Sequence, residues 1–359
     1  MLTADRPAPV EPEAPEAPRE PEPSWARGWS RLRYLVGAAV AVVLVLVVLP
    51  ALTGVGWAQL ATTAAQVSPV WLVALVVLWI VGLLAHTITL TAALPGLTHR
   101  RALTLSLTGS AVANVLPLGG AAGIALNHRM VRTWGHDGTS FGTYTVVSNV
   151  WDVLAKLVIP LVALPSLLVA ATSLGATAVH AAVALVVVLA VMAALVAVTL
   201  GSRRTADRTG ALADRLLGRW LRGRSCRQAL VDLQAATRQV VRTGWPRLSL
   251  GMALYSLLLF ALLAGCLTAT GAGLSLGAVA AGFAVERLLT LAGLTPGGAG
   301  VVEVGLTSAL LAFSGAPAGV ALGVLLYRTI TFGLEIPVGG VTLACWLWQR
   351  RRVERMAVA

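Results

Sequence analysis

Long uninterrupted apolar segments dominate the chain. The first runs from Tyr34 to Leu52, and its 19 residues carry no charge, which is close to the ~20 apolar residues that a helix needs to cross a bilayer core. Because the apolar residues are continuous and do not alternate with period two, they predict spanning helices and not the strands of a barrel. Further runs cover about 69–95, 103–127, 140–171, 176–200, 248–270, 276–293, 301–315 and 319–347.

Composition supports the same class of protein. Hydrophobic residues make up 57% of the 359 residues and charged residues only 12%, a balance that excludes a soluble enzyme with a polar surface. The net charge of +12 comes from residues between apolar runs, so it indicates membrane topology and no nucleic-acid partner. The three cysteines have no metal-ligand spacing, and no dinucleotide or phosphate motif is present. We therefore expect no metal, no cofactor and no catalytic residues.

The distribution of arginine predicts the orientation. Arg27, Arg31 and Arg33 lie directly before the first run, whereas residues 53–68 carry no charge. By the positive-inside rule this places the N-terminus in the cytoplasm of a multi-pass plasma-membrane protein. Residues 1–24 are rich in proline and glutamate and are expected to form a disordered cytoplasmic tail. A transmembrane domain follows at 25–350, and 351–359 form a second cytoplasmic tail.

A basic segment interrupts the apolar runs at 201–247. It contains eleven arginines and three aspartates, too many to translocate, so it is expected in the cytoplasm. Within it, Leu212, Leu216 and Trp220 share one helical face. This pattern predicts an amphipathic helix whose residues 203–224 contact anionic lipids of the inner leaflet. A connector that packs on the underside of the protein is the alternative.

Two glycine-rich breaks interrupt the apolar runs. Because the first break lies between Arg101 and Arg129, both expected in the cytoplasm, its run should enter and leave on the same side as a re-entrant hairpin. The second break is reached from the uncharged loop near Gly271, so its hairpin should enter from the opposite face. The predicted fold is thus an all-α polytopic helical membrane bundle with two re-entrant helical hairpins related by an inverted repeat. The breaks contain Pro117, Gly119 and Gly120, and Pro296, Gly297, Gly298 and Gly300.

Several motifs carry a family resemblance. They are Asn114-Val-Leu-Pro-Leu-Gly-Gly120, Pro296-Gly-Gly-Ala-Gly-Val-Val-Glu303, Leu326-Tyr-Arg-Thr-Ile-Thr-Phe332 and Pro337-Val-Gly-Gly340. Over roughly residues 34 to 350 the chain resembles the lysylphosphatidylglycerol synthase transmembrane-region family, also called flippase-like, and the second motif is the most specific. The resemblance implies a lipid flippase. Members that make lysyl-lipid carry a soluble aminoacyl-transfer domain, which we expect this chain to lack, and Leu118 and Ala121 stand where many members have charged residues.

Charged residues inside apolar runs are the candidate functional residues, because an ion in hydrocarbon needs a partner or water. Asp152 and the only lysine, Lys156, are four residues apart on one helical face and are expected to form an ion pair. In the structural interpretation this ion pair orients two helices. In the functional interpretation it binds substrate or carries a proton. Glu303 follows the second break and either caps its own helix or pairs with Arg328 across a polar cavity.

The predicted substrate pathway combines these charges with the breaks. Glu335 shares a helical face with Arg328, while Glu286 and Arg287 are assigned a secondary place, either in the pathway or at the membrane interface. The leading interpretation is a transporter or flippase for an anionic or lipid-linked substrate, since broken helices and polar interiors form midplane binding sites. The alternatives are a non-catalytic factor in envelope assembly and an intramembrane lipid-modifying enzyme. The pathway residues are Pro117, Gly119, Gly120, Pro296, Gly297, Gly298, Gly300, Glu303, Arg328 and Glu335.

Overall fold

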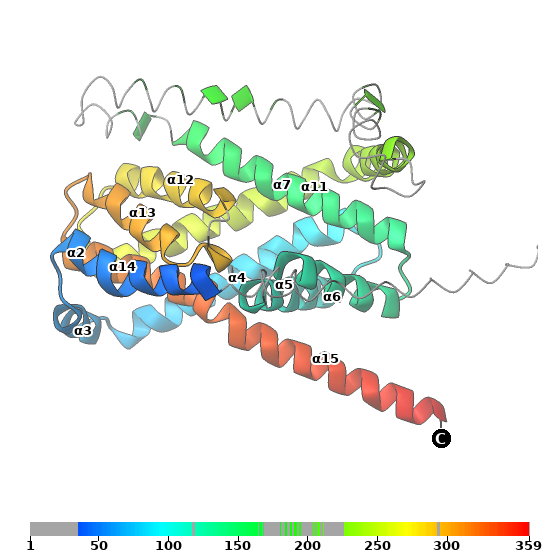
Figure 1. The fold of residues 1–359 in the computed structure, drawn as a ribbon, viewed down its shortest axis with the longest axis horizontal. Helices are drawn as coiled ribbons and strands as arrows, with labels where there is room; N and C mark the ends of the chain where they lie inside the picture. The colour runs from blue at the N-terminus through cyan, green and yellow to red at the C-terminus, as the bar shows by residue number, and fades with distance from the viewer. Residues whose placement is uncertain are drawn as a thin grey trace, which may run out of the picture.

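The protein is a bundle of helices, shown in Figure 1. The computed structural model describes residues 35–116, 119–163, 226–292 and 295–358, together with isolated positions between 165 and 211. Throughout these residues the regular secondary structure is helical. The predicted tail at 1–24 and the amphipathic face around Leu216 lie outside them.

The helices follow the apolar runs closely. The described elements are η1 (Leu44–Val48), α2 (Leu49–Thr53), α3 (Trp57–Ala65), α4 (Pro69–Ala93), α5 (His99–Val115), α6 (Gly119–Thr133), α7 (Gly138–Val162), α11 (Cys226–Ala269), α12 (Leu276–Ala292), η2 (Pro296–Gly298), α13 (Val301–Leu311), α14 (Pro317–Arg328), η3 (Thr329–Gly333) and α15 (Glu335–Val358). Hydrogen bonds to side chains cap the N-termini of several helices. Ser68 accepts a hydrogen bond from Val70 N at the start of α4, and Asp137 accepts one from Ser140 N at 2.6 Å at the start of α7. Hydrogen bonds from Ser140 hold the pKa of Asp137 below its usual value.

Five of the described helical segments are long and apolar enough to cross a membrane. The prediction of a polytopic helical membrane bundle is therefore confirmed. Large apolar side chains face outward along these helices, for example Val70 at 76% and Leu250 at 62% exposure, as expected where lipid replaces water as the solvent. The segments are Leu35–Thr53, Pro69–Ala93, Gly138–Val162, Gln234–Ala269 and Pro317–Arg352.

Helix α11 extends across the predicted boundary between the basic segment and the next apolar run. The sequence places a basic segment at 201–247 and an apolar run at 248–270, and α11 runs without interruption from Cys226 to Ala269 and contains Pro246. The helix thus carries the last part of the basic segment on the same axis as the apolar span. It packs along α4, where Thr89 Oγ1 donates to Leu248 O at 3.1 Å and Gly251 approaches the Thr89 backbone closely.

The two ends of the bundle differ in charge. At one end α11, α12 and α14 meet, with Thr270 Oγ1 donating to Gly319 O at 2.7 Å and Ala316 N donating to Ala272 O at 2.9 Å. The loops there, 270–275 and 312–316, carry no charge. At the opposite end, Thr87 Oγ1 bonds to His99 Nδ1 at 2.7 Å, and arginines follow in sequence. This asymmetry is typical of an outer and a cytoplasmic face.

Both glycine-rich breaks lie at the turns of helical hairpins. In the first, Gly119 on α6 lies against Ala113 on α5 and Gly123 lies against Gly109, so the two helices run antiparallel. In the second, Gly282 on α12 lies against Leu306 and Leu310 on α13, again antiparallel. The α5–α6 hairpin opens at the charged end of the bundle and the α12–α13 hairpin at the uncharged end (Figure 1). That the hairpins are re-entrant and related by an inverted repeat stays a prediction.

Candidate functional site

The second break is a tight turn that only glycine can form at several positions. Gly297, Gly298 and Gly300 all have positive φ, at 60°, 71° and 79°. A Cβ atom at Gly297 would lie 2.0 Å from the Phe332 ring, and one at Gly300 would lie 2.8 Å from the Ala41 backbone. The break therefore lies tightly between the first spanning helix and η3. It also packs against α5, the helix that leads into the first break.

Arg328 holds this turn in place. Its Nε donates to Glu303 Oε1 at 3.0 Å and its Nη2 donates to the Gly297 carbonyl oxygen at 2.9 Å. Its guanidinium carbon also lies 5.1 Å from the centre of the Phe332 ring. Arg328 is 8% exposed and Glu303 6%, so the two predicted residues are brought together as a buried ion pair. Glu303 does not use both of its oxygens in this pair.

The remaining oxygen of Glu303 is buried without a hydrogen-bond partner in the described structure. Thr307 Oγ1, one helical turn further along α13, is in the same situation. Unsatisfied buried polar atoms are rare and costly, and they often mark a site for a ligand or an unseen water. Thr307 was not identified from the sequence, although its spacing from Glu303 is a usable signal.

A second ion pair lies beside the first. Glu286 pairs with its neighbour Arg287, whose Nη2 also donates to Tyr327 Oη at 3.3 Å. Tyr327 is also within electrostatic reach of Arg328, so the two ion pairs and this tyrosine form one group of buried polar residues. It is here called the ionic cluster and consists of Glu286, Arg287, Glu303, Tyr327 and Arg328. Because Glu286 is 0% exposed, the Glu286–Arg287 pair is buried within the protein, and its place in the pathway or at the membrane interface stays a prediction.

The pair Asp152–Lys156 is formed as the spacing predicts. Lys156 Nζ lies 2.7 Å from Asp152 Oδ2 within α7. His86 on α4 is near both charges and stacks on Tyr255 of α11, with ring centroids 4.5 Å apart. The pair thus lies where α7 faces α4 and α11, close to the ionic cluster but outside it.

At the first break the structure describes Gly119 and Gly120, while Pro117 lies outside the described residues. A Cβ atom at Gly119 would lie 2.0 Å from the Ala113 carbonyl oxygen, whereas one at Gly120 would have no neighbour within 4 Å. Of the two, Gly119 is therefore the position at which close helix approach requires glycine.

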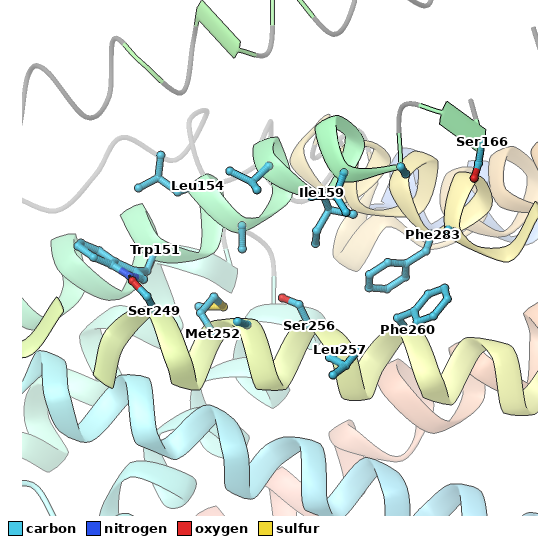
Figure 2. A pocket seen from close by; sticks show the side chains of 16 residues that line it. Trp151, Leu154, Ile159, Ser166, Ser249, Met252, Ser256, Leu257, Phe260 and Phe283 are labelled. Carbon is cyan, nitrogen blue, oxygen red and sulfur yellow. The ribbon is translucent and has the colours of Figure 1, made fainter. Parts of the chain in front are cut away.

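An apolar groove was not predicted from the sequence. It has a volume of about 740 Å³ and lies between α7, α11 and α12 (Figure 2). Trp151 Nε1 donates to Ser249 Oγ at 3.2 Å at one end, and Phe260 and Phe283 pack edge to face at the other. Small residues on α11, Ser249, Ala253 and Ser256, line one wall. Their spacing of four and three residues is the sequence signal that could have indicated the groove.

The apolar groove and the ionic cluster meet at the side chain of Phe283. Phe283 lines the groove, and the guanidinium carbon of Arg287 lies 5.2 Å from the centre of its ring. Val162 and Leu257, which also line the groove, are 77% and 61% exposed, so the groove is open along its length. The arrangement offers an apolar surface that ends at buried charges.

Comparison with known protein families matches this architecture. The family model described as the lysylphosphatidylglycerol synthase TM region matches residues 34–339. Because the match covers most of the chain, the chain belongs to this family, and the resemblance of its motifs is confirmed. No curated protein matches the sequence.

Proposed function

We propose that this member of the family moves an amphipathic lipid, or a lipid-linked group, between the two leaflets of the plasma membrane without changing it chemically. Membership of the family and several apolar helices fit a flippase-like membrane protein. A lipid substrate requires two different surfaces within reach of each other. One must accept acyl chains and the other a polar head group.

The contact between groove and ionic cluster is the observation that carries the proposal. The groove has an apolar lining with three serines, and Phe283 joins it to Arg287. A lipid whose chains lie between α7 and α11 would bring its head group toward Arg287 and Arg328. Transporter sites of this kind combine broken helices with charges at membrane depth.

An anionic head group suits the charges of the site best. The guanidinium groups of Arg287 and Arg328 are planar donors that match phosphate geometry. The N-terminus of α13, which begins directly after the second break at Val301, adds partial positive charge. The buried carboxylate partners, Glu286 and Glu303, compensate these arginines when the head group has left.

The charge asymmetry of the bundle supports the proposed orientation. The end containing His99 is rich in arginine, and the end containing Gly319 carries no loop charge. We place the charged end, together with both termini, in the cytoplasm.

Reconstituted vesicles provide the test. Purified protein is incorporated into liposomes that contain fluorescent phosphatidylglycerol, and an impermeant quencher reports how fast the probe moves between leaflets. We expect the protein to accelerate this movement and the recovered lipid to have an unchanged mass. A recovered lipid of changed mass would instead support a lipid-modifying enzyme. If the protein does not accelerate lipid movement, a non-catalytic role in envelope assembly is favoured.

Two neighbouring substitutions connect the activity to the groove. Ala253→Trp places a large ring in the groove, whereas Leu254→Trp changes the next residue of α11, which does not line it. We expect Ala253→Trp to reduce translocation strongly and Leu254→Trp to leave it near the unmodified rate. Equal rates for the two variants would show that lipid does not use the groove.

A further inference from the structure

The charges inside the bundle do not cancel. Three ion pairs are neutral as pairs: Asp152–Lys156, Glu286–Arg287 and Glu303–Arg328. Glu335, which is partly buried, forms no ion pair with any described residue. A carboxylate in hydrocarbon surroundings without a cation takes up a proton or binds another positive species. Glu335 is thus an acidic group that has no cation partner among the described residues and can bind one.

The position of Glu335 is fixed by close packing. It is the first residue of α15 and follows the π-helical turn η3, a feature that is frequent at functional sites. One turn later, a Cβ atom at Gly339 would lie 2.2 Å from the Leu107 carbonyl oxygen. This contact presses α15 against α5 and places the Glu335 carboxyl opposite the Ser110 hydroxyl.

The other groups around Glu335 are Arg328 and Tyr255. Arg328 is within electrostatic reach of Glu335 from the end of α14, and Tyr255 from α11. Arg328 already donates to Glu303 and to the Gly297 carbonyl. A charged Glu335 therefore competes for the same guanidinium that holds the second break.

We propose that Glu335 binds and releases a proton during transport, so that lipid movement is coupled to a proton gradient. The inference rests on the proposed function and adds its energy source. When Glu335 takes up a proton, its carboxylate becomes a neutral carboxylic acid that donates to Ser110, and Arg328 stays on Glu303 and Gly297. When the proton leaves, the carboxylate attracts Arg328 and weakens its bond to the break.

A proton fits this site better than a metal cation. Hard cations require several oxygen ligands, and the described residues contain no group of three or more His, Cys, Asp or Glu that could hold a metal ion. At Glu335 the facing oxygen ligand is the Ser110 hydroxyl. A proton needs only the carboxylate itself.

The test uses the full chain in liposomes with a pH difference across the membrane and the voltage clamped by potassium and valinomycin. If one proton moves with each lipid, a difference of one pH unit shifts the equilibrium distribution of fluorescent phosphatidylglycerol between leaflets about tenfold. Glu335→Gln should lose this shift, so that the lipid distribution no longer follows the pH difference. Glu335→Asp, which keeps a carboxyl, should retain the shift, and thermal unfolding of each variant reports folding.

Each outcome separates the two proposals. A shift that persists in Glu335→Gln would overturn the assignment to Glu335. If the unmodified protein translocates lipid independently of pH, the proposed coupling to protons is wrong and the proposed function stands. If translocation depends on a sodium gradient and not on pH, the coupled ion is a metal ion and not a proton. If no lipid is translocated under any gradient, both the proposed function and the proposed proton coupling are wrong.

Discussion

The guanidinium of Arg328 joins the last long helical span to the second break and to the helix that follows the break. It donates to the carboxylate of Glu303, which follows the break, and to the carbonyl of Gly297, which lies within it. These contacts are buried, so removal of either Arg328 or Glu303 would leave an unpaired charge inside the protein and release the turn. The same contacts would have to loosen for a head group to pass, since a phosphate would compete with Glu303 for the arginine.

Removing Arg328 should destabilise the protein strongly. Arg328→Ala leaves the Glu303 carboxylate buried and unpaired, and breaking a buried pair in this way costs about 3–5 kcal/mol. The double variant Glu303→Leu/Arg328→Met removes both charges and should recover most of that stability. A deficit of roughly 1 kcal/mol should remain, because the Gly297 carbonyl loses its donor.

Thermal unfolding of the detergent-solubilised protein measures both effects. The double variant should nevertheless fail to translocate fluorescent phosphatidylglycerol, because the arginine is gone. A double variant as unstable as Arg328→Ala would mean that the ion pair is not the source of the loss. Full translocation by the double variant would exclude Arg328 from the substrate pathway.

The helical fold could be predicted because lipid imposes a simple rule. A spanning helix must be predominantly apolar over about 20 residues, so the runs around Leu75 or Leu262 are visible directly. The start of α11 at Cys226 was not predicted, because a helix can continue beyond its apolar run without any change in its backbone hydrogen bonds. Polar residues mark the edge of the lipid but not the end of α11.

The candidate site was predictable only in part. Glu303 and Arg328 could be paired because an isolated charge at depth is costly. That Arg328 also donates to Gly297 depends on the fold of the break, which no residue pattern specifies. The groove depends on the distance between α7 and α11, and side chains such as Trp151 and Phe260 define it only after the helices have packed.

The pair Asp152–Lys156 should be structural. Exchanging the two residues, Asp152→Lys with Lys156→Asp, keeps an i,i+4 pair on the same face of α7. The orientation of such a pair changes helix stability by at most about 0.5 kcal/mol. We expect the exchanged variant to unfold at nearly the same temperature and to translocate lipid within about twofold of the unmodified rate.

Lys156→Met serves as the comparison, because it leaves Asp152 without its partner near His86. This variant should be less stable than the exchanged one. If the exchanged variant folds normally but does not transport, the positions of the two charges matter for the substrate, and the structural interpretation is excluded.

Labelling of introduced cysteines should reveal the orientation. Ala316→Cys places an exposed thiol at the uncharged end of the bundle, and Thr133→Cys places one at the charged end. In a background without the native cysteines, an impermeant maleimide applied to intact cells should label Ala316→Cys alone. Thr133→Cys should react only after the cells are permeabilised. The reverse pattern would invert the proposed topology.

Two adjacent glycines at the first break offer the sharpest test of its geometry. A Cβ atom at Gly119 would lie 2.0 Å from the backbone oxygen of Ala113, whereas Gly120 faces open space. Gly119→Ala must push α5 and α6 apart and should cost about 1–3 kcal/mol. Gly120→Ala should be nearly neutral, since its new methyl group meets nothing.

The same pair of variants connects the break to transport. Because the second break packs against α5, a shift of α5 away from α6 should also disturb the Arg328 contacts and lower translocation of fluorescent phosphatidylglycerol. Thermal unfolding and vesicle assays on both variants separate loss of folding from loss of movement. A Gly119→Ala protein with unchanged stability and transport would show that the close approach of the two helices at the first break has no role in the site.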